Sequence, residues 1–223
     1  MKEIQIQKRE FKLVTLKDVQ NPLFWVLSFT LLICFNSIYP YLNMVENLLE
    51  TKYCISSIMA GYLFEIPYVI SAICSIFIGI LVDKIGRRLN FILLGNLFVF
   101  LAFFISIATP VSCPATSYSE VLPLTLIGLS YAIFGSTLWS AISFTVEPHA
   151  TGTAYGITHC FLNIGRVIFP TVSGIINEQT KQVEGGYFYE TLFWIFISMI
   201  SFVTTLILQF LDRRGTQKVC INN

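Results

Sequence analysis

Six apolar segments, each about 20 residues long, constrain the fold of this chain more than any other feature of its sequence. They cover residues 22–42, 57–82, 89–108, 121–146, 153–176 and 188–211. A helix of about 20 apolar residues crosses the roughly 30 Å hydrocarbon core of a bilayer. Composition agrees, because 55% of the residues are hydrophobic and 12% are charged, which is too apolar for a soluble domain. We therefore predict an all-α integral membrane protein with six transmembrane helices.

The apolar segments divide the chain into three regions. Residues 1–21 form a polar tail, residues 22–211 a six-helix transmembrane bundle, and residues 212–223 a second tail. Since the first tail is polar and charged, we interpret 22–42 as a membrane span and not as a cleavable signal sequence. The net charge of +1 gives no indication of a nucleic-acid partner.

A charged turn separates the second span from the third. Four of the ten residues in 79–88 are charged, in the pattern G-x-x-x-D-[RK]-x-G-[RK]-[RK]. The pattern is filled by Gly79, Asp83, Lys84, Gly86, Arg87 and Arg88. Gly79 leaves room for a close neighbouring helix, and Gly86 has the backbone freedom of a tight turn. The charge of Asp83 suits a helix N-terminus, and we expect it near the start of the fifth span, around 151–154. The alternative is a merely basic loop.

This turn resembles the cytoplasmic signature loop of the major facilitator superfamily, a family of secondary transporters. Polar residues are concentrated in the first two spans of each group of three, and the third has few. That distribution matches inverted 3+3 repeats, in which the third helix of each repeat is an outer support. The resemblance therefore implies one half of a major facilitator fold. A second six-helix bundle is expected beside it, as a second copy of the chain or as a separate half, because the transport site of such proteins lies between two bundles.

The distribution of positive charge predicts the orientation in the membrane. Of the fourteen lysine and arginine residues, eleven lie in the two tails and the 79–88 turn. The loops on the other side contain two, Lys52 and Lys181, and Arg166 lies inside a span. Cytoplasmic loops carry the excess of Lys and Arg, so both termini are expected in the cytoplasm.

The fifth span has one polar face along its whole length. At 100° per residue, seven residues fall within about 80° of one another. These residues are Gly152, Tyr155, His159, Asn163, Arg166, Pro170 and Ser173. Polar groups facing lipid are costly, so this stripe is expected to face protein or a water-filled cavity. Lining a substrate cavity and hydrogen bonding to a neighbouring helix without substrate contact are both compatible with the pattern.

Glu65 and Arg166 are the two charges deep inside the spans. They lie at similar depth on equivalent helices of the two repeats, so one is suited to a substrate ammonium and the other to its carboxylate. The alternative is that they pair with each other, or with a second bundle. The fourth span adds small polar residues at helical spacing, Ser136 and Ser140. Together with Trp139 of the same span, Tyr155, His159 and Asn163, these are the candidates for a substrate pathway.

A closer resemblance involves the stretch from Leu122 to Gly165. It contains Gly128-Leu129-Ser130-Tyr131, Leu138-Trp139, Glu147-Pro148-His149, Gly152-Thr153-Ala154-Tyr155-Gly156 and Asn163-x-Gly165. These residues resemble the major facilitator superfamily domain-containing protein 1 family, the lysosomal dipeptide transporters. The resemblance implies dipeptide export across the lysosomal membrane by the C-terminal six helices of twelve, with a glycosylated accessory subunit. It does not assign Glu65 or Arg166, because the family pattern is not charged there.

We expect a facilitator-type secondary transporter, or half of one, for dipeptides or amino acids. The alternative is a truncated or accessory membrane subunit without transport activity of its own. The sequence contains two histidines and no nucleophile and base arrangement or metal-like cluster, so neither an enzyme nor a cofactor is expected. Cys54 and Cys113 lie in the two non-cytoplasmic loops, where a disulfide between them is compatible with an oxidising lumen.

Overall fold

The described residues of the computed structural model, 21–109, 120–182 and 186–214, are almost entirely helical. The α-helices are α1 (Pro22–Asn36), α2 (Tyr39–Tyr53), α3 (Ser57–Ile85), α4 (Arg88–Ala108), α5 (Val121–Ser143), α6 (Thr151–Gln179) and α7 (Tyr187–Arg214), with the 3-10 turn η2 (Pro148–Ala150) before α6. Six helical segments in these residues are long and apolar enough to cross a membrane, counting α1 with α2 and η2 with α6. The predicted all-α fold with six spans is confirmed.

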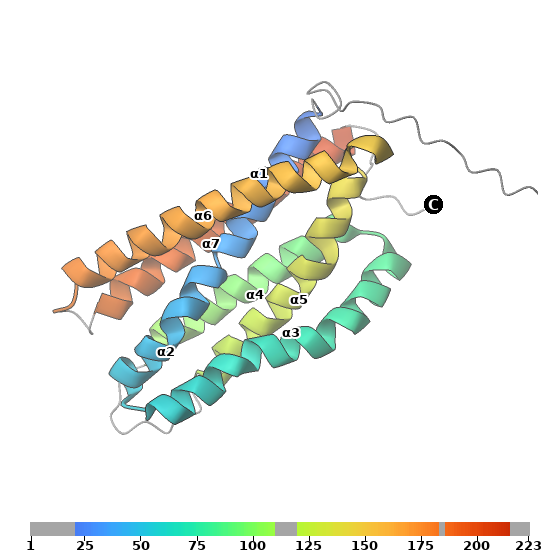
Figure 1. Ribbon diagram of the computed structural model, residues 1–223. Coiled ribbons are helices and arrows are strands. Elements are labelled where there is room, and N and C mark those ends of the chain that lie inside the picture. The colour runs from blue at the N-terminus through green and yellow to red at the C-terminus, as the bar shows by residue number, and fades with distance from the viewer. Residues whose placement is uncertain (1–20, 110–119, 183–185, 215–223) are drawn as a thin grey trace, which may run out of the picture.

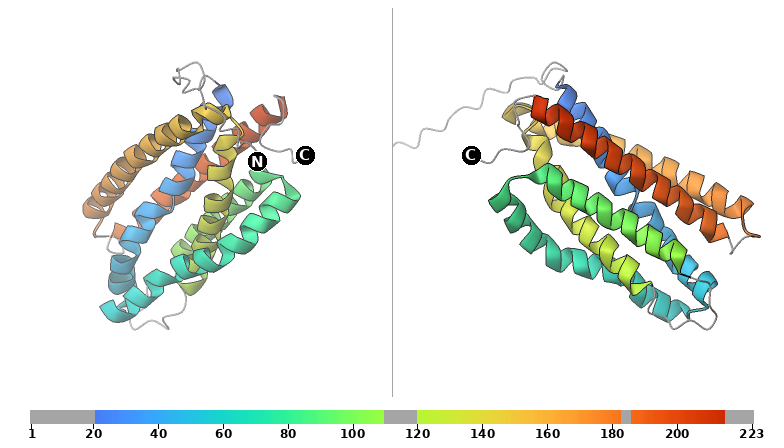
Figure 2. Two further views of the ribbon diagram at one scale, coloured as in Figure 1. Left: turned by 45° about the vertical axis from the view of Figure 1, so that its right-hand side comes forward. Right: turned by 180° about the vertical axis from the view of Figure 1, so that it is seen from behind.

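The helices form two groups, and each group contains the first helix of one three-helix repeat and the second and third helices of the other (Figure 1). Helix α5 packs against α3 and α4, and α1 packs against α6 and α7. Both views in Figure 2 show α3 and α6 at opposite edges of the bundle. Since the first helix of each three-helix repeat packs on the second and third helices of the other repeat, the contacts have the symmetry expected of the 3+3 arrangement.

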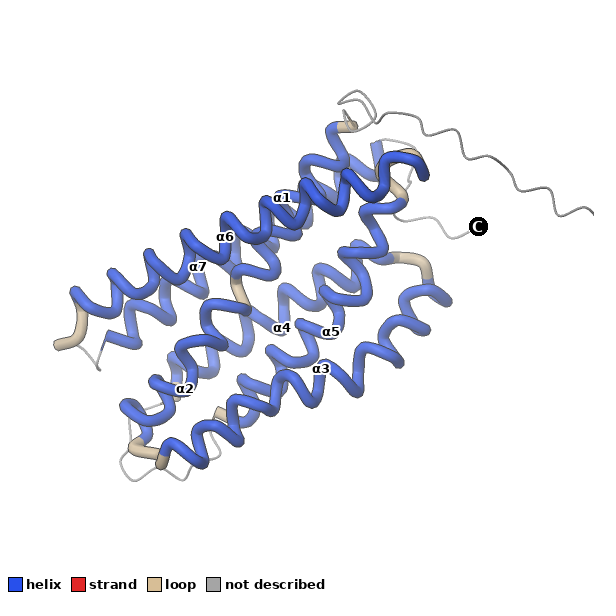
Figure 3. Tube along the Cα trace, in the orientation of Figure 1, coloured by secondary structure: helices blue, strands red, loops and turns tan. Residues whose placement is uncertain are grey.

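The first span is longer than predicted and is broken. We expected it to end at residue 42, but α1 ends at Asn36 and α2 continues to Tyr53, with Ser37 and Ile38 between them (Figure 3). The break has a local cause, because Pro40 has no N–H to donate to the carbonyl of Asn36. The predicted boundary was wrong because the polar residues after 42 indicated a loop, whereas α2 keeps one buried face that includes Val45 and Leu49.

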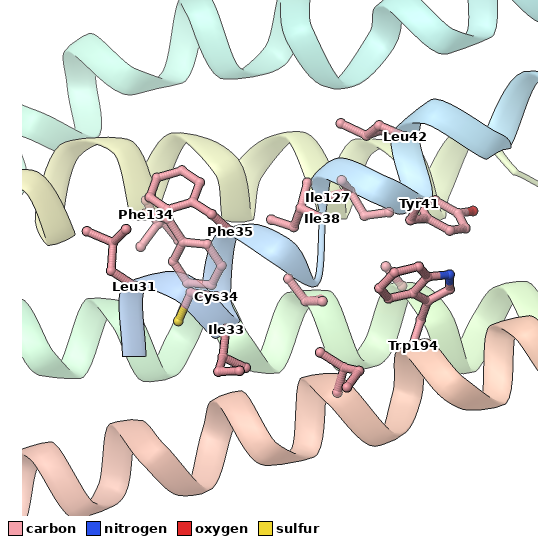
Figure 4. Packing of buried hydrophobic residues seen from close by; sticks show 14 of the residues in the cluster. Leu31, Ile33, Cys34, Phe35, Ile38, Tyr41, Leu42, Ile127, Phe134 and Trp194 are labelled. Atoms are coloured by element: carbon pink, nitrogen blue, oxygen red, sulfur yellow. The ribbon is translucent and has the colours of Figure 1, made fainter. Parts of the chain in front are cut away.

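The core is formed where α1 and α2 cross α5 and α7. Figure 4 shows Phe35 and Phe134 beside Ile38, and Tyr41 near Trp194, all of which are buried. These side chains hold the broken first span in the centre of the bundle, because the helix is interrupted between α1 and α2.

A close approach of two backbones joins α3 to α5. A Cβ at Gly128 of α5 would lie 2.7 Å from the carbonyl oxygen of Pro67 and 2.8 Å from its Cα. Only glycine fits this contact without displacement of backbone. Helix α3 continues through Pro67.

The turn at 79–88 ends α3 and begins α4. Gly86 has φ 76° and its N–H donates to the carbonyl oxygen of Val82 at 2.8 Å, so it has the C-cap conformation that favours glycine. Asp83 accepts a hydrogen bond from Arg88 at 3.0 Å, and its expected approach to the N-terminus of α6 stays a prediction. A Cβ at Gly79 would meet no atom within 4 Å among the described residues, so the helix expected there is not one of this bundle.

Cys54 is disulfide-bonded. Its expected partner, Cys113, lies outside the described residues, so the predicted pairing stays a prediction.

Candidate functional site

Most of the polar stripe of α6 lies on the surface of the bundle. Helix α6 packs on α1 through Ala154, Thr158 and Leu162, which are buried, and Ser28 of α1 lies 3.0 Å from Thr158 through their hydroxyl oxygens. The stripe is rotated away from this contact, and its members His159, Asn163 and Arg166 are exposed. In a membrane these groups require water or another protein surface.

The stripe departs from our expectation at its last member. Ser173 is buried, and its Oγ donates to Glu190 of α7 at 2.6 Å. Asn177 donates to the other carboxylate oxygen of Glu190 at 2.7 Å. This end of the stripe is therefore a helix-helix contact, because a hydrogen-bonded, buried side chain has no capacity left for a solute.

Arg166 lies beside the break between α1 and α2. Its guanidinium carbon is 4.4 Å from the ring centroid of Tyr39, the first residue of α2. One guanidinium nitrogen, Nη1, donates to Oδ1 of Asn163 at 3.4 Å. A guanidinium stacked on an aromatic face keeps its planar edge of N–H donors available to other acceptors.

Tyrosines from three helices, α2, α3 and α5, lie together at the break. The hydroxyl oxygens of Tyr39 and Tyr131 of α5 are 2.8 Å apart, and the ring of Tyr68 of α3 is 6.4 Å from that of Tyr131. Together with Arg166 of α6, four helices converge at the break. We call Tyr39, Tyr68, Tyr131 and Arg166 the break cluster.

A second aromatic group lies along the same face toward the start of α6. Trp139 of α5 stacks on His159 with ring centroids 4.5 Å apart. The hydroxyl of Tyr155 donates to the carbonyl oxygen of Trp139 at 3.1 Å and lies 3.0 Å from Oγ of Ser143. Phe35 connects this group to the break cluster, because its ring is 6.0 Å from both Trp139 and Tyr131. The two groups are therefore joined through the buried ring of Phe35.

Glu65 and Arg166 do not pair. Glu65 is exposed on α3 and has no hydrogen bond or ion pair among the described residues. Arg166 contacts Asn163 and Tyr39 instead. The interpretation in which the two charges neutralise each other within this bundle is therefore wrong for the described arrangement, and both remain on the surface.

Ser136 and Ser140 stabilise helices and do not join either aromatic group. Ser136 donates to the carbonyl oxygens of Ala132 at 2.9 Å and of Ser75 in α3 at 3.2 Å. Ser140 donates to carbonyls of its own helix, at Ser136 and Thr137. Hydroxyl groups so bonded act locally on the backbone.

Sequence reasoning missed the three tyrosines of the break cluster. Two signals were available in the sequence: Pro40 marks the break after Asn36, and Tyr131, Gly135 and Trp139 recur every four residues of α5, which places them on one helix face. The contact between Tyr39 and Arg166 joins elements more than 120 residues apart, so spacing alone does not predict it.

The sequence profile of the Major Facilitator Superfamily matches residues 4–219. The lysosomal dipeptide transporter MFSD1 of Bos taurus is 29% identical over 198 residues, which cover 88% of this chain and 39% of the relative. The human protein of the same name is 28% identical over 203 residues, 91% of this chain and 41% of the relative. A probable small intestine urate exporter of Homo sapiens is 28% identical over 127 residues, 55% of this chain and 26% of the relative. The chain thus spans about two fifths of the length of the dipeptide transporters that it matches.

Proposed function

Because the chain belongs to the Major Facilitator Superfamily, a family of transporters and not of enzymes, we propose that it forms half of a secondary transporter for a small solute with a free carboxylate, a dipeptide or an amino acid. The observation that carries this proposal is Arg166, whose guanidinium stacks on Tyr39 at 4.4 Å and is exposed on the polar face of α6. The names of the dipeptide transporters that the chain resembles support the same substrate class.

The chemistry of Arg166 favours a carboxylate ligand. Arginine binds a carboxylate through two parallel N–H donors, and the stacked ring fixes the plane of the guanidinium before the ligand arrives. Glu65 on the equivalent helix α3 is suited to a substrate ammonium, since it has no basic partner among the described residues. His159, Asn163 and Tyr155 complete the polar lining between Arg166 and the start of α6.

The exposed edges of the bundle require a partner. Arg166 and Glu65 facing lipid would each cost about 2.5–3.5 kcal/mol. A second six-helix bundle, supplied by a second copy of this chain or by a separate chain, covers α3 and α6 and encloses the polar surface. Native mass spectrometry in a mild detergent is expected to detect this assembly, and a species of 25.3 kDa that alone performs saturable uptake would contradict it.

The location of the protein follows from the same resemblance. We propose a multi-pass protein of the lysosomal membrane with both termini in the cytoplasm, associated with a glycosylated accessory subunit. The second candidate function is a membrane subunit without transport of its own.

Uptake by vesicles from cells that express the chain tests the proposed function. The expected substrate is a dipeptide with a free C-terminus, and its C-terminal amide is expected to be transported poorly. Arg166→Lys loses the bidentate contact and is expected to reduce uptake of the free acid by about 10- to 100-fold, with little effect on the amide. Arg213→Leu, at an exposed arginine near the end of α7, is the matched control and is expected to leave uptake unchanged. Equal uptake of acid and amide, unaffected by Arg166→Lys, would contradict the proposal.

A further inference from the structure

A buried polar cluster lies at the end of the bundle opposite the 83–88 turn. It joins the last residues of α2, the last turn of α4 and the residue before α5. Its members are Lys52, Tyr53, Ser106 and Glu120, which are 6%, 1%, 1% and 1% exposed. Burial of a carboxyl and an ammonium group costs free energy unless their contacts compensate for the lost water. The burial of Lys52 and Glu120 therefore needs a structural or functional explanation.

Glu120 is the centre of the cluster. Its Oε1 accepts hydrogen bonds from the hydroxyl of Tyr53 and, at 3.1 Å, from Oγ of Ser106. Lys52 Nζ donates to the carbonyl oxygen of Ser106 at 2.8 Å and lies 5.2 Å from the centroid of the Tyr53 ring. The second carboxyl oxygen of Glu120, Oε2, is buried and has no hydrogen-bond partner among the described residues. One side chain therefore holds the ends of α2, α4 and α5 together, with one of its oxygens unsatisfied.

The unsatisfied oxygen makes the charged form of Glu120 the more expensive one to bury. Desolvation raises the pKa of the Glu120 carboxyl, and Tyr53, Lys52 and Ser106 lower it by a smaller amount. Tyr41 of α2 is also within electrostatic range of Glu120. A raised pKa in the closed cluster means that the proton stabilises the closed cluster. This stabilisation is fully present below the ordinary glutamate pKa of about 4.3 and is lost as the pH rises from there.

Helix α2 connects this cluster to the break cluster. Tyr39 begins α2, and Lys52 and Tyr53 end it, about 20 Å apart along the helix axis. The break at Ser37 and Ile38 separates α2 from the rest of the first span. A change at the Tyr53 end is therefore transmitted by a short rigid helix to Tyr39, whose ring stacks on Phe35 of α1 at 5.8 Å.

We propose that Glu120 is a proton-binding site that controls the position of α2. With the proton bound, Glu120 holds the Tyr53 end of α2 against α4 and α5. When the proton leaves to the aqueous phase at that end of the bundle, the carboxylate hydrates, the Tyr53 end is released, and Tyr39 shifts against Arg166. This proposal concerns only the positions of the helices and goes beyond the proposed function. It does not depend on whether the chain transports a dipeptide.

Hydrogen exchange of α2 tests this inference without a substrate. The full chain in lipid nanodiscs is labelled at about pH 5 and about pH 7, with labelling times scaled for the intrinsic exchange rate. Amides of the second half of Tyr39–Tyr53 are expected to exchange at least about threefold faster at the higher pH. Glu120→Gln, which cannot ionise, is expected to bring this ratio to about one. A ratio of one in the parent chain, or an unchanged ratio in Glu120→Gln, overturns the proposal.

Two further variants keep the test decisive if Glu120→Gln fails to fold. Tyr53→Phe removes a hydrogen bond that lowers the pKa of the Glu120 carboxyl, so the rise in exchange is expected to move to higher pH. Glu190→Gln is the matched control, because Glu190 is equally buried but has both oxygens hydrogen-bonded, by Ser173 and Asn177. It is expected to keep the pH response of the parent. An unshifted response in Tyr53→Phe, or loss of the response in Glu190→Gln, overturns the assignment to Glu120.

Discussion

Two asparagines in apolar helices, Asn96 of α4 and Asn163 of α6, have opposite surroundings. Asn96 is 1% exposed. Its Nδ2 donates to Oγ1 of Thr205 at 2.9 Å, and its Oδ1 accepts from Oγ of Ser201 at 2.7 Å. Cys34 of α1 lies 3.0 Å from the same Ser201 hydroxyl. Asn163 is exposed and has the guanidinium of Arg166 at 3.4 Å.

The difference shows how to separate helix packing from a solute pathway in a membrane protein. A polar side chain whose hydrogen bonds are satisfied inside its own bundle stabilises helix association, as Asn96 does between α4 and α7. A polar side chain left on the outside of the bundle requires water, a ligand or a second protein. Hydropathy and spacing treat the two asparagines alike, and only their hydrogen-bond partners distinguish them.

Breaking the buried network is expected to have the largest effect on stability. Asn96→Leu leaves the hydroxyl of Ser201 without its acceptor and is expected to lower the free energy of unfolding by about 1–2 kcal/mol. Asn163→Leu is expected to change it by less than about 0.5 kcal/mol and to reduce uptake instead. Unfolding in mixed micelles followed by circular dichroism measures both, and equal destabilisation by the two variants would remove the distinction.

The hydroxyl pair of the break cluster is expected to have an intermediate effect. Tyr39→Phe removes the 2.8 Å hydrogen bond to Tyr131, worth about 1 kcal/mol, or about fivefold in apparent affinity for the dipeptide. Tyr131→Phe is expected to have the same effect, and the double variant no more than either single one, because both remove one bond. The apparent affinity of each variant is measured from the dependence of uptake on dipeptide concentration. If the losses of affinity in the two single variants add up in the double variant, the two hydroxyls do not act as a unit.

The smallest effect is expected at Ser140, which sequence reasoning placed in the pathway. Its hydroxyl donates only within α5, to Ser136 and Thr137. Ser140→Ala is therefore expected to leave uptake unchanged and stability within about 0.5 kcal/mol. A severalfold loss of uptake in this variant would return Ser140 to the pathway.

The sequence predicted the arrangement of the helices better than the contacts of single residues. Spans of about 20 apolar residues and the 3.6-residue period are local properties, so six spans and the exposed side of α6 followed from them. The continuation of the first span to Tyr53 did not follow, because α2 has polar residues on one face and its stability depends on burial of the other.

The buried charges at helix ends were missed for the same reason. Glu120 and Lys52 stand next to loops, where charge normally indicates solvent. Their burial depends on the meeting of α2 with α4 and α5, across contacts that join residues 54 and 67 apart in the chain. The serines of α5 were predicted to line a cavity, and in the structure their hydroxyls bond to backbone carbonyls; their place in the pathway stays a prediction.

The central claim is that the outer polar face of α6 borders water in the assembled protein, and cysteine accessibility tests it most directly. Asn163→Cys is compared with Ile168→Cys, in a background in which Cys74, Cys160 and Cys220 are replaced by alanine. Ile168 is 52% exposed in this bundle but lies about 140° from Asn163 around the helix, so exposure alone does not separate the two positions.

Membrane fragments that contain each variant, with both faces accessible, are treated with a membrane-impermeant thiol reagent. We expect rapid modification at position 163, slowed by a saturating dipeptide, and little modification at position 168, which faces lipid or the second bundle. Protection of both positions, or equal modification of both, would contradict a water-filled pathway along α6.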